Sequence, residues 1–258
     1  MYVLGIDIGS TASKAVVMTD EKKIYAKALI PHGTGSIGPR KVYEKILLEN
    51  NLTQEDISRT LATGYGRFVF PNADSQKSEI SCHTKGIFFI NPNIRTVIDI
   101  GGQDVKAIRF NDKGMIVNFT MNDKCAAGTG RFLENMAKVL NVETEDLGDI
   151  SEKSEEAVEI SNTCTVFAES EVISKLSSNA KLEDLVAGIH KSVAKRVASL
   201  AFRNGIEEQV AMSGGVALNT GIVKALAEEI KTDIFVHEDC QFFGAIGAAL
   251  FALEELEK

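Results

Sequence analysis

The spacing of apolar and polar residues changes several times along the chain, and each change predicts an element of secondary structure. Residues 2–8 alternate towards Asp7 and the pattern breaks at Gly9, which predicts a strand that leads into a tight turn. Residues 15–18 and 23–30 continue as strands. Residues 183–202 have helical spacing instead. The apolar positions on that helical face are Leu185, Val186, Ile189, Val193, Val197 and Leu200. The chain is therefore expected to be an α/β protein.

Further elements follow from the same patterns. Residues 55–62 fit either a short helix or its lead into a strand, and the small residues of 244–249 predict a last helix that packs closely on a neighbouring helix. The other expected helices are residues 40–49, 76–89, 130–140, 165–177 and 219–230, and the other expected strands are residues 209–212 and 232–236.

An internal repeat is the clearest architectural signal. Asp7-Ile8-Gly9, followed by Lys14-Ala15, returns as Asp99-Ile100-Gly101, followed by Lys106-Ala107, with the same spacing. Each copy predicts a strand, a glycine turn and a return strand. Two similar domains are therefore expected.

The first copy carries groups that suit phosphate. Gly9 lets the backbone approach a ligand closely, Ser10 and Thr11 add donors, and Lys14 supplies a positive charge. Asp7 is expected to hold Mg²⁺ through water, because Mg²⁺ keeps part of its hydration shell. A plain glycine hairpin with a polar corner explains one such turn as well, but the repetition favours phosphate binding.

Two later glycine turns extend this interpretation. Asp99-Ile100-Gly101-Gly102-Gln103 offers a facing copy, and two such turns on opposed domains would clamp a triphosphate. Gln103 is expected to act with Asp7 in catalysis by orienting the attacking water, because an amide positions water without being a strong base. The third turn, residues 213–219, suits a flat adenosine. The expected cofactor contacts in these two turns are Asp99, Gly101, Gly102, Gln103, Gly214, Gly215, Val216 and Asn219.

Charge and composition narrow the class of protein. The chain has 258 residues and a net charge of −8, whereas a nucleic-acid binder usually carries a basic patch. Its start has no basic leader, and its longest apolar run, residues 242–253, is shorter than the ~20 residues of a membrane span. We expect a cytoplasmic protein whose four cysteines indicate metal or redox chemistry, or burial, before disulfides.

Two of the cysteines stand before predicted helices. Cys125 lies in Lys124-Cys125-Ala126-Ala127-Gly128-Thr129-Gly130-Arg131, and Cys164 lies in Ser161-Asn162-Thr163-Cys164-Thr165-Val166-Phe167. Free amides and the positive end of a helix dipole favour a thiolate in such a place. The plain alternative is that both are small buried side chains.

The order of phosphate turn, connecting helix, second phosphate turn, adenosine turn and small-residue helix resembles the actin/Hsp70/sugar-kinase ATPase superfamily over nearly the whole chain. No GxxxxGK[ST] stretch occurs in the sequence, so a P-loop site is not expected. The two cysteine motifs and residues 99–104 resemble one branch, the activators of 2-hydroxyacyl-CoA dehydratases together with the ATP-binding subunits of benzoyl-CoA reductase. The resemblance implies a two-domain actin-like ATPase fold of duplicated ribonuclease-H-like domains, with mixed sheets flanked by helices. We place the domains at residues 1–90 with 240–258 and at residues 91–239.

The resemblance also implies a function. A homodimer would share one [4Fe-4S] cluster bound by Cys125 and Cys164 of each chain. ATP hydrolysis would drive a low-potential electron from reduced ferredoxin or flavodoxin into a 2-hydroxyacyl-CoA dehydratase. A subunit of a benzoyl-CoA-type reductase is the alternative within the family. The residues that the resemblance places at the nucleotide are Asp7, Ser10, Thr11, Asp99, Gln103, Gly214 and Gly215.

The residues by themselves leave the metal open. Two cysteines cannot complete a site of four thiolates, but two chains related by a two-fold axis supply Cys125 and Cys164 twice. Cys82 and Cys240 are expected in the other domain. Four thiolates also suit Zn²⁺, which would make the chain a nucleotide switch, and a small-molecule kinase without a cluster is a further hypothesis.

Some polar residues have no chemistry assigned by the sequence. Glu79 and His83 lie one helical turn apart and are expected to form a solvent-exposed pair, although either suits water positioning. Glu169 and Glu171 are expected at the exposed surface. The turn Gly64-Tyr65-Gly66-Arg67 is expected to be a structural loop.

Overall fold

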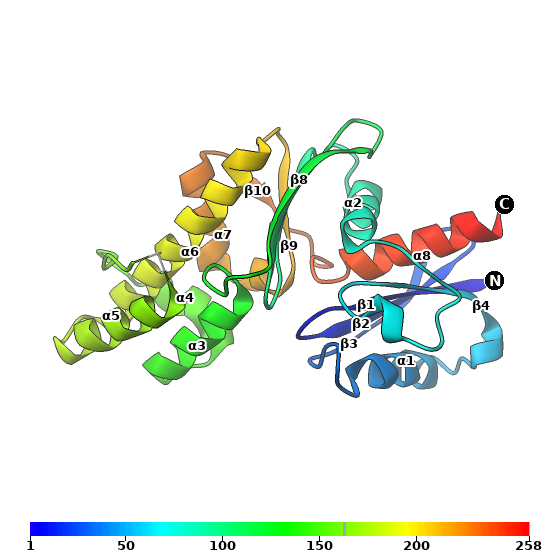
Figure 1. Ribbon diagram of the computed structural model, residues 1–258, viewed down its shortest axis with the longest axis horizontal. Helices are drawn as coiled ribbons and strands as arrows, with labels where there is room; N and C mark the ends of the chain where they lie inside the picture. The colour runs from blue at the N-terminus through cyan, green and yellow to red at the C-terminus, as the bar shows by residue number, and fades with distance from the viewer. Residues whose placement is uncertain (162–163, 258) are drawn as a thin grey trace. The chain divides into compact units, whose positions relative to one another are not determined.

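The computed structural model describes residues 1–161 and 164–257, which form two compact units (Figure 1). Unit 1 contains Met1–Ile94, Phe110–Val117 and the chain from Glu238 onward. Unit 2 contains Arg95–Arg109 and the described part of Asn118–His237. The domain boundaries expected from the sequence stay a prediction. The compact units differ from them chiefly at Phe110–Val117, which joins unit 1.

Aromatic packing explains why Phe110–Val117 joins unit 1. The rings of Phe88 and Phe110 meet edge to face with their centroids 6.3 Å apart. Gly114 has a φ of +71°, and a Cβ at this position would lie 2.9 Å from Cδ1 of Phe88. The glycine therefore lets the chain lie flat on that ring.

Unit 1 is a five-stranded mixed sheet in the order β3-β2-β1-β4-β5. Its strands are β1 (Tyr2–Ile8), β2 (Ser13–Thr19), β3 (Ile24–Ile30), β4 (Ile57–Thr63) and β5 (Ser75–Gln76). β1 pairs antiparallel with β2 and parallel with β4. Helix α1 (Gly38–Glu49) covers one face, and α8 (Phe243–Leu256) covers the other, with α2 (Glu79–Ile90) packed on α8 (Figure 1).

Strand β1 is buried on both faces because helices cover each of them. Leu4 and Ile6 pack in one core with Val42 of α1. On the opposite face, a Cβ at Gly5 would come within 2.1 Å of the carbonyl oxygen of Ala245 in α8. The small residues that begin α8 therefore bring this helix directly onto the strand, as well as onto α2.

The second sheet has the order β10-β9-β6-β7-β8, the same topology as the first. Its strands are β6 (Thr96–Ile100), β7 (Val105–Phe110), β8 (Ile116–Asn122), β9 (Val210–Ser213) and β10 (Ile234–Phe235). The helices of unit 2 are α3 (Gly130–Leu140), α4 (Leu147–Ser151), α5 (Thr165–Ser177), α6 (Leu182–Asn204) and α7 (Thr220–Ile230). The 3₁₀ segments of the described chain are η1 (Gln54–Asp56), η2 (Arg67–Val69), η3 (Thr144–Asp146) and η4 (Gly215–Leu218).

The two sheets share one register at their first turns. Asp7 lies opposite Lys14 across β1 and β2, and Asp99 lies opposite Lys106 across β6 and β7. In both sheets an aspartate at the end of a strand therefore faces the lysine of the return strand. The internal repeat of the sequence is a repeat of structure.

Some elements differ from the expected ones. Of the two alternatives for residues 55–62, the structure has the short helical turn that leads into a strand, because these residues divide between the end of η1 and most of β4. β8 was not expected, because side chains such as Val117 and Phe119 are exposed and no buried face marks the strand. The short elements β5 and α4 were also missed. No helix among residues 1–161 and 164–257 combines the length and the apolar character needed to cross a membrane.

Candidate functional site

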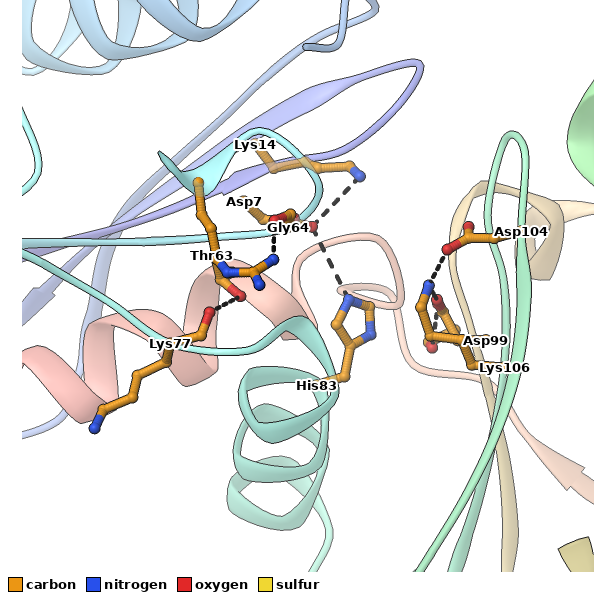
Figure 2. Close-up of polar contacts among 11 residues, drawn as sticks. Asp7, Lys14, Thr63, Gly64, Lys77, His83, Asp99, Asp104 and Lys106 are labelled. Atoms are coloured by element: carbon orange, nitrogen blue, oxygen red, sulfur yellow. Dashed lines mark hydrogen bonds and ion pairs between the residues drawn. The ribbon is translucent and has the colours of Figure 1, made fainter. Parts of the chain in front are cut away.

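Asp7 is the buried centre of the first phosphate turn, and it is 2% exposed. Its Oδ2 is 3.5 Å from the Lys14 ammonium and 4.0 Å from Nε2 of His83 (Figure 2). Its Oδ1 has no hydrogen-bond partner within the described chain. A buried carboxylate with an open acceptor fits the expected role of Asp7, which is to hold Mg²⁺ through water.

Glycines from other elements shape the space around this carboxylate. Gly64 has a φ of +84°, and a Cβ there would lie 2.4 Å from Asp7 Oδ1. A Cβ at Gly244 would lie 2.9 Å from Asp7 Oδ2. Gly66 N donates to the carbonyl of Ile8 at 2.9 Å. The turn at residues 64–67 is thus a wall of the Asp7 site, a role that its own sequence did not indicate.

Backbone hydrogen bonds close the first phosphate turn. Gly9 N donates to the Ala12 carbonyl at 3.0 Å, and the Gly9 carbonyl accepts from Thr34 N at 2.9 Å. Ser10 and Thr11 are half-buried in this turn. The structure therefore brings Gly9, Ser10 and Thr11 together beside the buried aspartate and its lysine.

His83 was expected in a solvent-exposed pair with Glu79, and this prediction is wrong. His83 is 5% exposed, and Glu79 is half-buried. The reason is that α2 packs on α8, and Gly244 at the start of α8 leaves room for the imidazole. A Cβ at Gly244 would lie 2.9 Å from Nε2 of His83.

The second phosphate turn, in unit 2, has two carboxylates around one buried ammonium. Asp99 is 2% exposed and Lys106 is 1% exposed. Lys106 Nζ lies 3.3 Å from Asp99 Oδ2 and 2.5 Å from Asp104 Oδ2 (Figure 2). Ser213 Oγ donates to Asp99 Oδ1 at 2.7 Å. Gln103, the expected water-positioning residue, is exposed in this turn.

The third glycine turn packs against the second. Gly214 has a φ of +87°, and a Cβ there would lie 2.2 Å from the Ile100 carbonyl oxygen. Together with the bond from Ser213 to Asp99, this contact joins the two turns in unit 2. Gly215 is exposed, whereas Val216 is buried.

Asn219 has both of its side-chain groups engaged within unit 2. Its Oδ1 accepts from Ile222 N at 3.1 Å and caps α7. Its Nδ2 lies 3.2 Å from Nε2 of His190. The expected contact of Asn219 with the nucleotide stays a prediction.

His190 contacts Asn219, the last residue of the third glycine turn, and the sequence did not predict this role. The side chain is 1% exposed on α6, and burial lowers its pKa to about 4. Because the amide of Asn219 faces Nε2, the neutral ring is assigned its proton on Nδ1. A lone histidine within a helical run carries no sequence signal for this role.

Helix α3 begins on the second phosphate turn. Gly130 N donates to the Gly101 carbonyl, and Arg131 N donates to the Gly102 carbonyl, both at 2.9 Å. Just upstream, Thr129 Oγ1 donates to the Ala126 carbonyl at 2.7 Å and holds the turn that follows Cys125. The cysteine segment and the phosphate turn are therefore joined by backbone hydrogen bonds.

The two cysteine motifs meet at one hollow in unit 2. Cys164 is the N-cap of α5, and Cys125 precedes the turn at residues 126–129, after which α3 begins at Gly130; both helices begin where they were expected. Arg196 Nη2 donates to Cys125 Sγ at 3.1 Å. Asn162 and Thr163 of the second motif lie outside the described residues. The hollow is lined by Ala127, Gly128, Phe132, Ser161, Cys164, Ala168, Ser192, Val193 and Arg196.

The other two cysteines are buried in unit 1. Cys82 and Cys240 are both 0% exposed, and burial raises the pKa of Cys82 to about 12. A neutral thiol is therefore expected at Cys82.

The prediction that Glu169 and Glu171 lie at the exposed surface is wrong. Both side chains are half-buried, and Glu171 Oε2 accepts a hydrogen bond from Ser161 N at 2.8 Å.

Known proteins resemble this chain over its whole length. A 2-hydroxyisocaproyl-CoA dehydratase activator from Clostridioides difficile is 55% identical over 258 residues, which cover 100% of this chain and 97% of that protein. An activator of lactoyl-CoA dehydratase from Anaerotignum propionicum is 54% identical over 258 residues, which cover 100% of both chains. The solved structure of the activator of the 2-hydroxyisocaproyl-CoA dehydratase from Clostridium difficile with bound ADPNP is 55% identical and has a TM-score of 0.97. It covers 100% of this chain and 96% of that chain.

The fold alone is shared more widely. A ROK family glucokinase from Streptomyces griseus has a TM-score of 0.60 at 11% identity and covers 98% of this chain and 100% of that chain. The two-domain actin-like ATPase fold expected from the sequence is confirmed. Residues 4–252 match the pattern of one family within this fold. The chain belongs to the BadF/BadG/BcrA/BcrD ATPase family.

Proposed function

We propose that this chain is the ATP-hydrolysing activator of a 2-hydroxyacyl-CoA dehydratase. As a homodimer it transfers a low-potential electron from reduced ferredoxin or flavodoxin to that enzyme, through a [4Fe-4S] cluster between the two copies. One observation carries the proposal. Both cysteine motifs border one hollow, in the unit whose phosphate turn is hydrogen-bonded to the helix that follows Cys125. Two relatives that are more than half identical and are named as dehydratase activators support it.

The nucleotide is assigned to the glycine turns. In unit 1, Asp7 holds Mg²⁺ through water, and its buried, open Oδ1 supports this role. In unit 2, Gln103 orients the attacking water from its exposed place in the second turn. The remaining assigned contacts are Gly9, Ser10, Thr11, Lys14, Asp99, Gly101, Gly102, Gly214, Gly215, Val216 and Asn219.

The cluster is assigned to Cys125 and Cys164. Two sulfurs supply half of a site of four thiolates, so a second copy of the chain must supply the other half. Cys164 caps a helix of 13 residues, whose N-terminus favours negative charge. When bound, the cluster supplies storage of one electron at low potential.

The backbone links the nucleotide turn to Cys125. The first two amides of α3 are held by the Gly101 and Gly102 carbonyls, so a displacement of that turn displaces the start of the helix. The bonds from Thr129 N and Oγ1 to the Ala126 carbonyl make the intervening turn stiff. ATP binding and hydrolysis at the turn would therefore move the Cys125 segment, because packed elements transmit small ligand-driven shifts.

An anaerobic preparation tests the proposal. We expect about four iron and four sulfide per dimer, as a [4Fe-4S] cluster requires, together with ATP-dependent reduction of the partner dehydratase. Cys125→Ser and Cys164→Ser should lose the iron, whereas Cys240→Ser, a change at a buried cysteine of unit 1, should keep it.

Three results would contradict the proposal. Cys125→Ser could retain full electron transfer, the protein could be monomeric with its cluster intact, or it could hold no iron after reconstitution. Zinc in place of iron with negligible turnover would instead support a nucleotide switch. Oxygen-insensitive phosphoryl transfer to a small molecule would support a kinase.

A further inference from the structure

Arg196 contacts one of the two proposed ligand sulfurs from within the protein. Its Nη2 donates a hydrogen bond to Cys125 Sγ at 3.1 Å. The arginine is half-buried on α6, a helix of 23 residues. A guanidinium is always charged and is well suited to a hydrogen bond with an anionic sulfur.

One face of α6 reaches both cysteine segments. Ser192 and Arg196 lie one helical turn apart and therefore on the same face. Ser192 Oγ donates to the Ser161 carbonyl at 3.1 Å, in the motif that contains Cys164. Both side chains line the hollow together with Cys164. The helix is thus a common support for the two segments.

Gly128 leaves room for the arginine beside the Cys125 turn. This glycine has a φ of +93°, and a Cβ there would lie 3.3 Å from Cδ of Arg196. The aliphatic stem of Arg196 therefore lies against the turn, and the guanidinium ends at the sulfur. A side chain at position 128 would compete for that space.

The two cysteines receive positive charge from different sources. Cys164 is the N-cap of α5 and lies at the positive end of that helix. Cys125 has no comparable helix end, because the first two amides of α3 donate to the Gly101 and Gly102 carbonyls instead. Arg196 supplies at Cys125 what the helix N-terminus supplies at Cys164.

We propose that Arg196 sets the reduction potential of the cysteine-bound centre through its hydrogen bond to Cys125 Sγ. This inference rests on the proposed function. A donor at a ligand sulfur stabilises the reduced, more negative form over the oxidised form, so it raises the potential. Arg196 is a positioning residue, and it makes the centre reducible by its electron donor.

The test is a redox titration of the anaerobic holoprotein with three variants. Arg196→Met keeps the stem and removes the charge. At a fixed applied potential it should lower the ratio of reduced to oxidised centre by about tenfold or more. This corresponds to a fall in the reduction potential of ~59 mV for a one-electron couple. Arg196→Lys keeps the charge without the planar donor pair and should shift it less. Lys195→Met removes a charge from the next, exposed position of α6 and should leave the potential unchanged.

Iron content separates a redox role from a structural one. Arg196→Met with full iron and sulfide and an unchanged potential would overturn the inference, while the proposed function would stand. An unsubstituted protein without iron would overturn both.

A second measurement begins with the unsubstituted protein. Arginine labelled with ¹⁵N should give a hyperfine coupling to the reduced centre by pulsed electron paramagnetic resonance. The coupling should disappear in Arg196→Lys. An unsubstituted, fully loaded protein that lacks this coupling would also overturn the inference, even if Arg196→Met fails to assemble its centre.

Discussion

Lowering the pH from about 7.5 to about 5 should destabilise this protein through His190. The imidazole is 1% exposed, and burial lowers its pKa from 6.5 to about 4. In the folded chain the ring accepts from Asn219 through Nε2 and stays neutral. In the unfolded chain it takes up a proton near its ordinary pKa, so acid favours the unfolded state.

The size of the effect follows from the two pKa values. The folded pKa lies below the unfolded one, so the stabilising contribution is complete above about pH 6.5 and is lost as the pH falls toward 4. With 1.36 kcal/mol for each pKa unit, the loss is about 2 kcal/mol at pH 5 and about 3 kcal/mol below pH 4. Losses of this size are a large share of the stability of an ordinary domain.

Urea unfolding followed by far-ultraviolet circular dichroism measures the effect. Intrinsic fluorescence is unsuitable, since the chain has no tryptophan and its four tyrosines all lie in unit 1. His190→Gln places an acceptor near the position of Nε2 but cannot titrate. The difference in unfolding free energy between the protein and this variant should therefore change by about 2 kcal/mol between about pH 7.5 and about pH 5.

His32→Gln is the matched control, because His32 is exposed. Its difference from the unsubstituted protein should stay flat over the same range. A flat difference for His190→Gln would refute the reasoning, since it would mean that burial does not keep the ring neutral.

Three further substitutions test the packing around the turns. Gly5→Ala should lower the unfolding free energy by about 1–3 kcal/mol or more, because the new Cβ meets the backbone of α8 at 2.1 Å. The control is Gly35→Ala, which has open space around it and should lose only the free energy of straining its positive φ. Equal urea midpoints for the two variants would contradict this prediction. Lys106→Met should lower the unfolding free energy by about 3–5 kcal/mol, because the buried Asp99 loses its ion pair. An unchanged thermal midpoint would show that this buried ion pair does not stabilise the fold. Gly128→Ala should lower the unfolding free energy by about 1 kcal/mol, because its φ of +93° strains any residue with a side chain. An unchanged unfolding free energy would show that the turn adjusts to the new side chain.

Sequence reasoning recovered the parts of the site that are local in the chain. The register of Asp7 with Lys14, and of Asp99 with Lys106, follows from a strand, a short turn and a return strand. Hairpins of this kind are encoded by spacing and turn residues over a few positions. The position of Cys164 directly before a helix was visible for the same reason.

The sequence placed Cys125 before a glycine turn and a helix at residues 130–140, and both are found, so the cysteine is separated from the start of its helix by that turn. Sequence spacing placed the cysteine before an amphipathic segment, and α3 begins at Gly130. What fixes that start is the pair of bonds to the Gly101 and Gly102 carbonyls, which come from a different part of unit 2. No local pattern near Cys125 contains them.

The sequence by itself determined the repeat, the glycine turns and the cysteine motifs, whereas only the tertiary structure decided what surrounds them. The wall that Gly64 and Gly244 form around Asp7, and the contact of Arg196 with Cys125, join residues far apart in the chain. A single glycine or arginine has no period along the sequence, so its role depends on which helix or strand packs beside it. That choice is made by the packing of whole elements, such as α8 on β1, and not by local spacing.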